Sequence, residues 1–214
     1  GTSDMQPLIG KVNGQQVFKF SNNVKSTVVG LNAGKANEVE YNTFIGNEAG
    51  FSNSRGSTNT FIGYQSGHSN TIGDGNYFSG YEAGWGNTTG RFNQFVGWAA
   101  GWANTTGNIN LFIGGEAGTS NTTASGNHFV GLSAGRSNTT GTSNHYEGFR
   151  AGSSNVAGNQ NLFLGYGAGE LGKGGSYNMY VGYQAGYKSE GTRNQFTGFQ
   201  AGYNNTTGFT NYFS

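Results

Sequence analysis

Aromatic side chains that could stack on sugar rings recur at a spacing of 17 residues. Tyr64, Tyr81 and Trp98 follow one another at this interval, and so do Trp85 and Trp102. Aromatic rings bind the C–H faces of sugars, while nearby amides and hydroxyls bind sugar hydroxyl groups. The pattern therefore predicts a glycan-binding surface, and we assign to it the tryptophans and several tyrosines: Trp85, Trp98, Trp102, Tyr64, Tyr81, Tyr183, Tyr187 and Tyr203.

The same rings have a second interpretation that involves no ligand. Side chains that recur at a fixed interval can stack on one another, or they can close an interface between subunits. Both interpretations remain open at the level of the sequence.

Two histidines, His128 and His145, are also 17 residues apart, and Glu147 follows closely. If the repeats stack, the histidines lie about one strand spacing apart. A metal pair is one interpretation, but exposed ladder histidines are commoner, so we expect no metal site. In an oligomer interface, copies of Glu147 would bind a cation, pair with Arg150 or become protonated. In a looser coil beside Tyr146, none of these would be needed.

The sequence contains no pattern typical of a catalytic site. No serine lies in a nucleophile elbow, and the ten acidic residues do not recur as the pair that glycosidases use. We therefore expect a protein that is not an enzyme, with no catalytic residue, no cofactor and no metal.

These candidate residues belong to a repeat that fills most of the chain. The third position of each unit is apolar, the fifth and ninth are glycine in every complete unit, and the eighth is alanine except at Ser66. Glycine at two fixed positions indicates sharp corners with positive φ or close backbone contact. The units begin at Ser26, Asn42, Asn59, Asn76, Asn93, Asn110, Asn127, Asn144, Asn161, Asn178, Asn194 and Asn211.

A unit this short suits one coil of a parallel β-solenoid, with coils about 4.8 Å apart. We predict an all-β fold with about eleven coils in a repeat domain at 26–214. Residues 1–25 form an N-terminal cap or connector, in which 17–20 should be a strand. Asparagines at the first and twelfth positions should form hydrogen-bonded ladders, because stacking places identical residues side by side.

Composition excludes several classes of partner. Charged residues make up 10 %, the net charge is +1 and the basic residues are scattered, so no concentrated basic face for nucleic acid is expected. The absence of cysteine excludes a disulfide scaffold. No apolar run approaches the ~20 residues of a membrane span, so we expect no membrane insertion by this segment.

The third and fourth positions are both apolar in most units, although neighbouring strand residues point to opposite faces. One face can be the interior of the coil, and the other should meet a second surface. A single chain has few aliphatic residues with which to build a core. We therefore predict a homotrimer of parallel chains, either side by side or intertwined.

The motif N-T-F-I-G-x-x-A-G at 42–50 resembles the head repeats of trimeric autotransporter adhesins of the YadA-like type. Those heads repeat on a shorter period and carry a small aliphatic residue in place of Phe. The N-T-T-G units at 87–90 and 104–107 are similar to repeats of phage and phage-like trimeric tail fibres. The resemblance covers 26–214 as a pattern and implies an extracellular fibre, on a cell surface or in a phage-like tail.

Three functions fit these observations. The first is an adhesin segment that recognises cell-surface glycans or polysaccharides for attachment to a host or prey cell. The second is a structural shaft that holds another tip domain away from a surface. The third is an ice-binding solenoid, for which paired threonines in five units are the only support. We rank them in this order.

Overall fold

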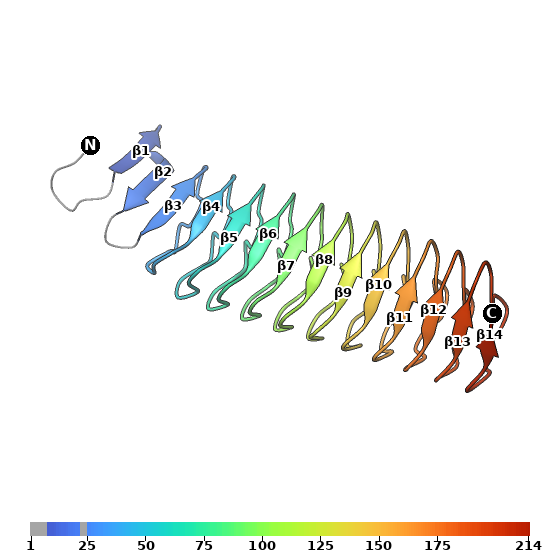
Figure 1. Cartoon of the computed structure of the whole chain (residues 1–214). Helices are drawn as coiled ribbons and strands as arrows, with labels where there is room; N and C mark the ends of the chain where they lie inside the picture. The colour runs from blue at the N-terminus through green and yellow to red at the C-terminus, as the bar shows by residue number, and fades with distance from the viewer. Residues whose placement is uncertain (1–7, 22–24) are drawn as a thin grey trace.

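One β-sheet with its strands in chain order organises the part of the chain that the structure describes. The computed structural model describes residues 8–21 and 25–214. Fourteen strands and no helix occur among these residues, and each strand pairs with its neighbours in the sequence. Figure 1 shows one strand per coil, from β3 to β14, stacked along a rod with the β1–β2 hairpin at one end.

The strands within the coils are short and evenly spaced. The first two strands, β1 (Leu8–Val12) and β2 (Gln15–Ser21), pair with each other antiparallel, and β2 pairs antiparallel with β3. The strand expected at 17–20 therefore lies within β2. The remaining strands run parallel: β3 (Ser26–Val29), β4 (Thr43–Ile45), β5 (Thr60–Ile62), β6 (Tyr77–Ser79), β7 (Gln94–Val96), β8 (Leu111–Ile113), β9 (His128–Val130), β10 (His145–Glu147), β11 (Leu162–Leu164), β12 (Met179–Val181), β13 (Gln195–Thr197) and β14 (Tyr212–Phe213).

This arrangement confirms the predicted parallel β-solenoid of about eleven coils. The middle residue of each three-residue strand points inward and is buried, as Phe95 is in β7. From Phe44 to Phe213 the inward rings form one continuous stack, with centroids 4.6–5.1 Å apart. Alanine at the eighth position fills the rest of the interior, as Ala100 does with no exposed surface. One chain therefore encloses its own Phe–Ala core.

Glycine is required at the fifth and ninth positions for the two reasons that the repeat predicts, a positive φ and close contact with neighbouring atoms. Gly97, at the fifth position, has a φ of +133°, and a Cβ there would lie 2.6 Å from the carbonyl of Gly114 in the next coil. Gly101, at the ninth, has a φ of +60°, and its Cβ would lie 2.5 Å from the Phe95 ring. A side chain would thus meet backbone at one corner and the core at the other, in conformations that disfavour L residues.

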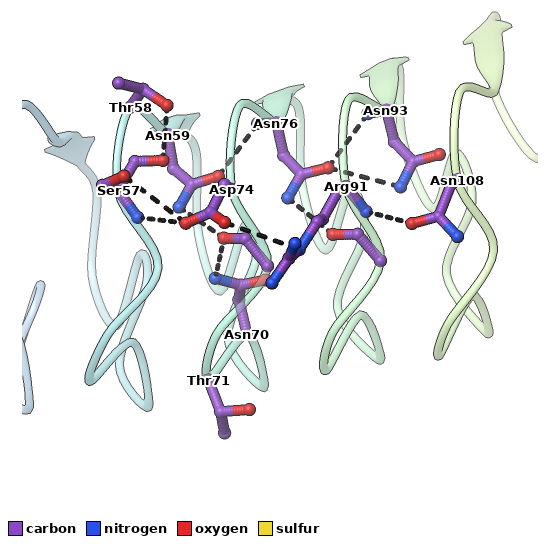
Figure 2. A network of polar contacts seen from close by, with 12 residues as sticks. Ser57, Thr58, Asn59, Asn70, Thr71, Asp74, Asn76, Arg91, Asn93 and Asn108 are labelled. Atoms are coloured by element: carbon purple, nitrogen blue, oxygen red, sulfur yellow. Dashed lines mark hydrogen bonds and ion pairs between the residues drawn. The ribbon is translucent and has the colours of Figure 1, made fainter.

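Buried asparagines join successive coils. At the first position, the backbone N–H of Asn76 donates to Asn59 Oδ1 at 2.9 Å, and the backbone N–H of Asn93 donates to Asn76 Oδ1 at 3.0 Å (Figure 2). At the twelfth position, Asn87 Nδ2 donates to Asn70 Oδ1 at 2.8 Å. Both predicted ladders are confirmed, although the first is closed mainly by backbone N–H groups. These bonds satisfy polar groups that would be costly to bury alone.

The second and fourth positions of each repeat unit, which are the first and last residues of the three-residue strands, point away from the core. Their side chains stay partly or largely exposed, since Val29 and Ile45 keep 38 % and 39 % of their surface. The inner face of the sheet is thus covered by the chain itself. The outer face remains open along the described coils and carries a row of aliphatic residues.

Candidate functional site

The sixth to tenth positions of each coil form a tight turn that points the candidate side chains outward. In the coil of residues 76–92, three hydrogen bonds close this turn, among them one from Trp85 N to Glu82 O at 3.2 Å. Glu82, at the seventh position, has a φ of +52°. This left-handed residue turns the backbone so that Tyr81, Glu82 and Trp85 keep exposed or half-exposed side chains.

The turns of four coils carry a group of rings that we call the N-terminal aromatic strip. At the tenth position, Phe51, His68, Trp85 and Trp102 stack with centroids 5.0, 5.7 and 5.2 Å apart. At the sixth position, Tyr64 stacks on Tyr81 at 5.2 Å. Neighbouring planes differ by 14° or less, so the faces of the rings cover one another. The strip consists of these six residues and Trp98: Phe51, Tyr64, His68, Tyr81, Trp85, Trp98 and Trp102.

A second group of rings, the C-terminal aromatic strip, begins three coils after Trp98. Its members stack in the same way, with centroids 4.8–5.2 Å apart: Phe149, Tyr166, Tyr183 and Phe199 at the sixth position, and Tyr187 and Tyr203 at the tenth. The eight residues that the sequence assigns to glycan binding therefore fall into two groups. Five lie in the N-terminal strip and three, Tyr183, Tyr187 and Tyr203, in the C-terminal strip.

The seventh position supplies polar groups to the N-terminal aromatic strip. Gln65 Nε2 donates to Glu48 Oε2 at 2.7 Å, and Trp102 Nε1 donates to Glu82 Oε2 at 3.1 Å. The neighbouring Glu82 carboxylate also raises the pKa of Tyr81. Glu82 thus connects the sixth-position ladder with the tenth-position ladder and fixes the Trp102 indole.

Sequence reasoning missed part of this strip. His68 completes the stack between Phe51 and Trp85, and its imidazole lies 3.8 Å from the Glu48 carboxylate. Its place at the tenth position, where aromatic residues recur, was the available signal. The bridging role of Glu82 had no such signal, because the seventh position varies between acidic, basic, amide and small residues.

The two strips are separated by the coils of residues 110–126 and 127–143. The sixth and tenth positions hold Gly115 and Thr119 in the first of these coils, and Leu132 and Arg136 in the second. Arg136 Nε pairs with Glu116 Oε2 at 3.2 Å, and Ser133 Oγ donates to the same oxygen at 3.1 Å. The rings therefore end abruptly at Trp98 and Trp102.

The predicted histidine pair is confirmed on the outer face of the sheet. His128 and His145 stack with centroids 4.3 Å apart, and burial, then the neighbouring imidazole, lowers the pKa of His128. His145 Nε2 lies 3.8 Å from Glu147 Oε2. Across residues 8–21 and 25–214, no three His, Asp or Glu side chains are grouped to hold a metal ion.

Arg150 has a partner other than Glu147. Its Nη1 lies 3.4 Å from Oε1 of Glu170, which is buried at the tenth position of the next coil. Of the three outcomes considered for Glu147, pairing with Arg150 does not occur within the single chain.

The sequence matches no protein-family model and no curated protein, and the structure matches no solved structure. Within the described residues, no helix has the length and apolar character needed to cross a membrane. The resemblance to adhesin heads and tail fibres therefore stays a prediction from the repeat motif.

Proposed function

We propose that this chain is a segment of an extracellular fibre that attaches to glycans on the surface of another cell. The connection from Tyr81 through Glu82 to Trp102 supports this proposal most directly. It combines aromatic rings with a fixed carboxylate on an exposed edge, which is the combination that carbohydrate recognition uses. The fibre belongs to a cell surface or to a phage-like tail, as the motif resemblance implies.

The charge of the N-terminal aromatic strip favours neutral glycans. Glu48 and Glu82 lie between its two ladders, whereas Glu116, two coils after Glu82, is paired with Arg136. Carboxylates at this spacing repel phosphate, sulfate and carboxylate groups of a ligand. Their oxygens and the Gln65 amide can instead accept and donate hydrogen bonds to sugar hydroxyls.

The open outer face of the sheet supports assembly into a trimer of parallel chains. The fourth position places aliphatic side chains in eight coils, and Leu111, Leu162 and Met179 add to them at the second position. An apolar row of this length, interrupted only at Ser79 and Glu147, marks a protein interface more often than a free surface. The row consists of Val29, Ile45, Ile62, Val96, Ile113, Val130, Leu164 and Val181.

A purely structural shaft is the second candidate. The stacked faces of the rings favour it, because ring stacking stabilises neighbouring coils without any ligand. A shaft of this kind would hold a separate tip domain away from the surface that carries it.

A glycan array separates the two candidates. The labelled chain should bind neutral glycans, and the triple variant Trp85→Ala, Trp98→Ala, Trp102→Ala should lose this binding while its mass by light scattering is unchanged. Phe92→Ala is the control, because Phe92 is 65 % exposed but lies outside the strip. If the wild-type rod binds no glycan, the shaft is the correct function.

A further inference from the structure

The N-terminal aromatic strip ends at a step in the surface of the rod. In the coil of residues 110–126, Gly115 follows Trp98 at the sixth position and Thr119 follows Trp102 at the tenth. Trp85 is covered on both sides, by His68 at 5.7 Å and by Trp102 at 5.2 Å. Trp102 has a ring on one side only, and Trp98 stacks on no ring of the described chain. Ring faces that meet another ring elsewhere in the strip meet no ring at this step.

Two other ladder ends are covered by cations. Lys35 Nζ lies 5.1 Å from the centroid of the Phe51 ring, and the Arg150 guanidinium lies 5.1 Å from that of Phe149. Within the described residues, no cation lies over Trp98 or Trp102. Trp98 keeps 53 % of its surface exposed and Trp102 keeps 37 %. On the side of the step, the two indoles thus meet neither a ring nor a cation of the described chain.

We propose that this step, formed by Trp98, Trp102, Gly115 and Thr119, is a saccharide subsite. A neutral hexopyranose stacks its C–H face on the indole faces and occupies the space that aromatic side chains at positions 115 and 119 would fill. This inference rests on the proposed glycan-binding function and assigns it to one position on the rod. A sugar at this step contacts the faces of the rings, where the π electron density lies, and not only their edges.

Polar groups surround the step at positions where sugar hydroxyls would lie. On the far side, the Glu116–Arg136 pair offers a carboxylate and guanidinium N–H groups, and the Arg136 side chain is half exposed. On the floor, Thr119 Oγ1 donates to the carbonyl of Ala99 at 3.0 Å, which leaves its lone pairs to accept. The hydroxyl groups of a sugar that is stacked on the indoles can therefore form hydrogen bonds with these donors and acceptors.

Two features hold the step in shape before a ligand arrives. The Glu82 carboxylate fixes Trp102 through its Nε1–H, and stacking on Trp85 fixes the plane of the indole. Gly115 leaves space beside Trp98, because a Cβ at this position would lie 3.6 Å from Trp98 Cε3 and would fill part of that space. Preorganised aromatic surfaces lose little conformational entropy on binding, which favours affinity.

Filling the step tests this proposal without removing any tryptophan. The double variant Gly115→Tyr, Thr119→Phe continues both ladders through the coil. The closest neighbour of a Cβ at Gly115 is the Leu132 Cδ1 at 3.1 Å, the end of a flexible side chain, and tyrosine occupies the equivalent position of other coils. Circular dichroism and the thermal midpoint check that the fold is retained.

The three tryptophans of the chain all lie in the N-terminal aromatic strip, so intrinsic fluorescence reports on it alone. The probes are neutral oligosaccharides that end in glucose, galactose or N-acetylglucosamine. We expect the wild-type signal to saturate with at least one probe, and the filled variant to lose about tenfold or more in affinity for it. Trp98→Ala and Trp102→Ala should lose as much, whereas Phe199→Ala, at the 74 % exposed end of the C-terminal aromatic strip, should stay within about twofold.

The outcomes distinguish the subsite from the function on which it rests. If the filled variant binds the probe as tightly as the wild type, the step is not the subsite, while glycan binding by the rod stands. If Phe199→Ala loses as much affinity as Trp102→Ala, binding does not depend on this step in particular and the proposal is again overturned. If the wild-type rod binds none of the probes, the proposed function and the subsite fail together.

Discussion

The indole N–H of Trp102 donates a 3.1 Å hydrogen bond to the carboxylate of Glu82, which belongs to the preceding coil. This bond joins two neighbouring coils, and it connects the polar residues at the seventh position to the rings at the tenth. It gives one exposed tryptophan a fixed orientation, because the acceptor is charged and charge-assisted hydrogen bonds are the stronger ones.

The first prediction concerns this bond. Glu82→Ala should weaken glycan binding about threefold to tenfold, because the Trp102 indole then has no acceptor and adopts several orientations. Affinity by fluorescence titration is the measurement. Gln200→Ala, at the seventh position of the C-terminal aromatic strip, should leave it unchanged. An equal loss in both variants would contradict a specific role for Glu82.

The second prediction separates two phenylalanines that are three residues apart. Phe95 is fully buried in the core stack, whereas Phe92 is 65 % exposed. Phe95→Ala should lower the free energy of unfolding by about 3–5 kcal/mol, since it leaves a cavity between two rings. Phe92→Ala should change it by about 0.5 kcal/mol or less. Urea denaturation measures both, and similar losses would mean that the ring stack is not the core.

The third prediction compares two glycines. Gly97→Ala should prevent folding or lower the thermal midpoint severely, because its Cβ would lie 2.6 Å from backbone atoms of Gly114 at a φ of +133°. Gly174→Ala should be neutral or slightly stabilising, because its Cβ would have no atom within 4 Å. Thermal unfolding followed by circular dichroism provides the comparison. A well-folded Gly97→Ala variant would contradict the close spacing of the coils.

The fourth prediction concerns two tyrosines that replace phenylalanine in the core. Burial raises the pKa of Tyr180 to about 12 and that of Tyr146 still further. The Tyr180 hydroxyl donates to Ser189 Oγ at 2.7 Å. Within the described chain, the Tyr146 hydroxyl makes no hydrogen bond of good geometry, although the Asn161 amide partly offsets the effect of burial on its pKa.

Both folded-state pKa values lie above the unfolded value of about 10, so the unfolded state loses these protons first as the pH rises. The stability of the rod should therefore be complete below pH 10 and fall as the pH rises from about 10 to 12. Tyr146→Phe should reduce this loss and stabilise the rod at neutral pH, because it removes a buried hydroxyl without a partner. Tyr180→Phe should reduce the alkaline loss but destabilise the rod at neutral pH. A pH series of urea unfolding midpoints tests this, and an unchanged profile in both variants would refute it.

Much of the coil could be predicted from the sequence because stacking repeats its requirements at a fixed interval. Phe95, Ala100 and Gly97 each meet the same residue type in the next coil, so packing and backbone contact leave the same signature in every unit. The asparagine ladders follow for the same reason. A feature that depends on one coil differing from its neighbours leaves no periodic signature.

The candidate site depends on a coil that differs from its neighbours, so it leaves no periodic signature in the sequence. The step exists because Gly115 and Thr119 lack rings, and the sequence analysis counted the rings that were present. The left-handed backbone at Glu82 and Ala99, with φ values of 52° and 50°, was also hidden, because neither residue type favours that conformation. The twelfth-position ladder is interrupted after Asn138, whose Oδ1 has no partner among the described residues, and the Asn155 Oδ1 accepts from Gly158 N within its own coil.

The fifth prediction concerns assembly through the outer face of the sheet. Light scattering should give three times the chain mass of 22.5 kDa. The double variant Ile113→Glu, Val130→Glu should reduce it to one chain, because charges at neighbouring rungs of an apolar interface are costly to bury. Thr106→Glu, an exposed substitution in a turn, should leave the trimer intact. A wild-type chain that is monomeric at micromolar concentration would contradict the assembly.

A crystal structure of the rod with its tightest array ligand is the most direct test of the central claim. The account predicts electron density for a pyranose parallel to the Trp102 indole and beside Trp98, above Gly115 and Thr119, with hydroxyls toward the Glu116–Arg136 pair. Density for the sugar at any other position on the rod, with the step empty, would contradict it.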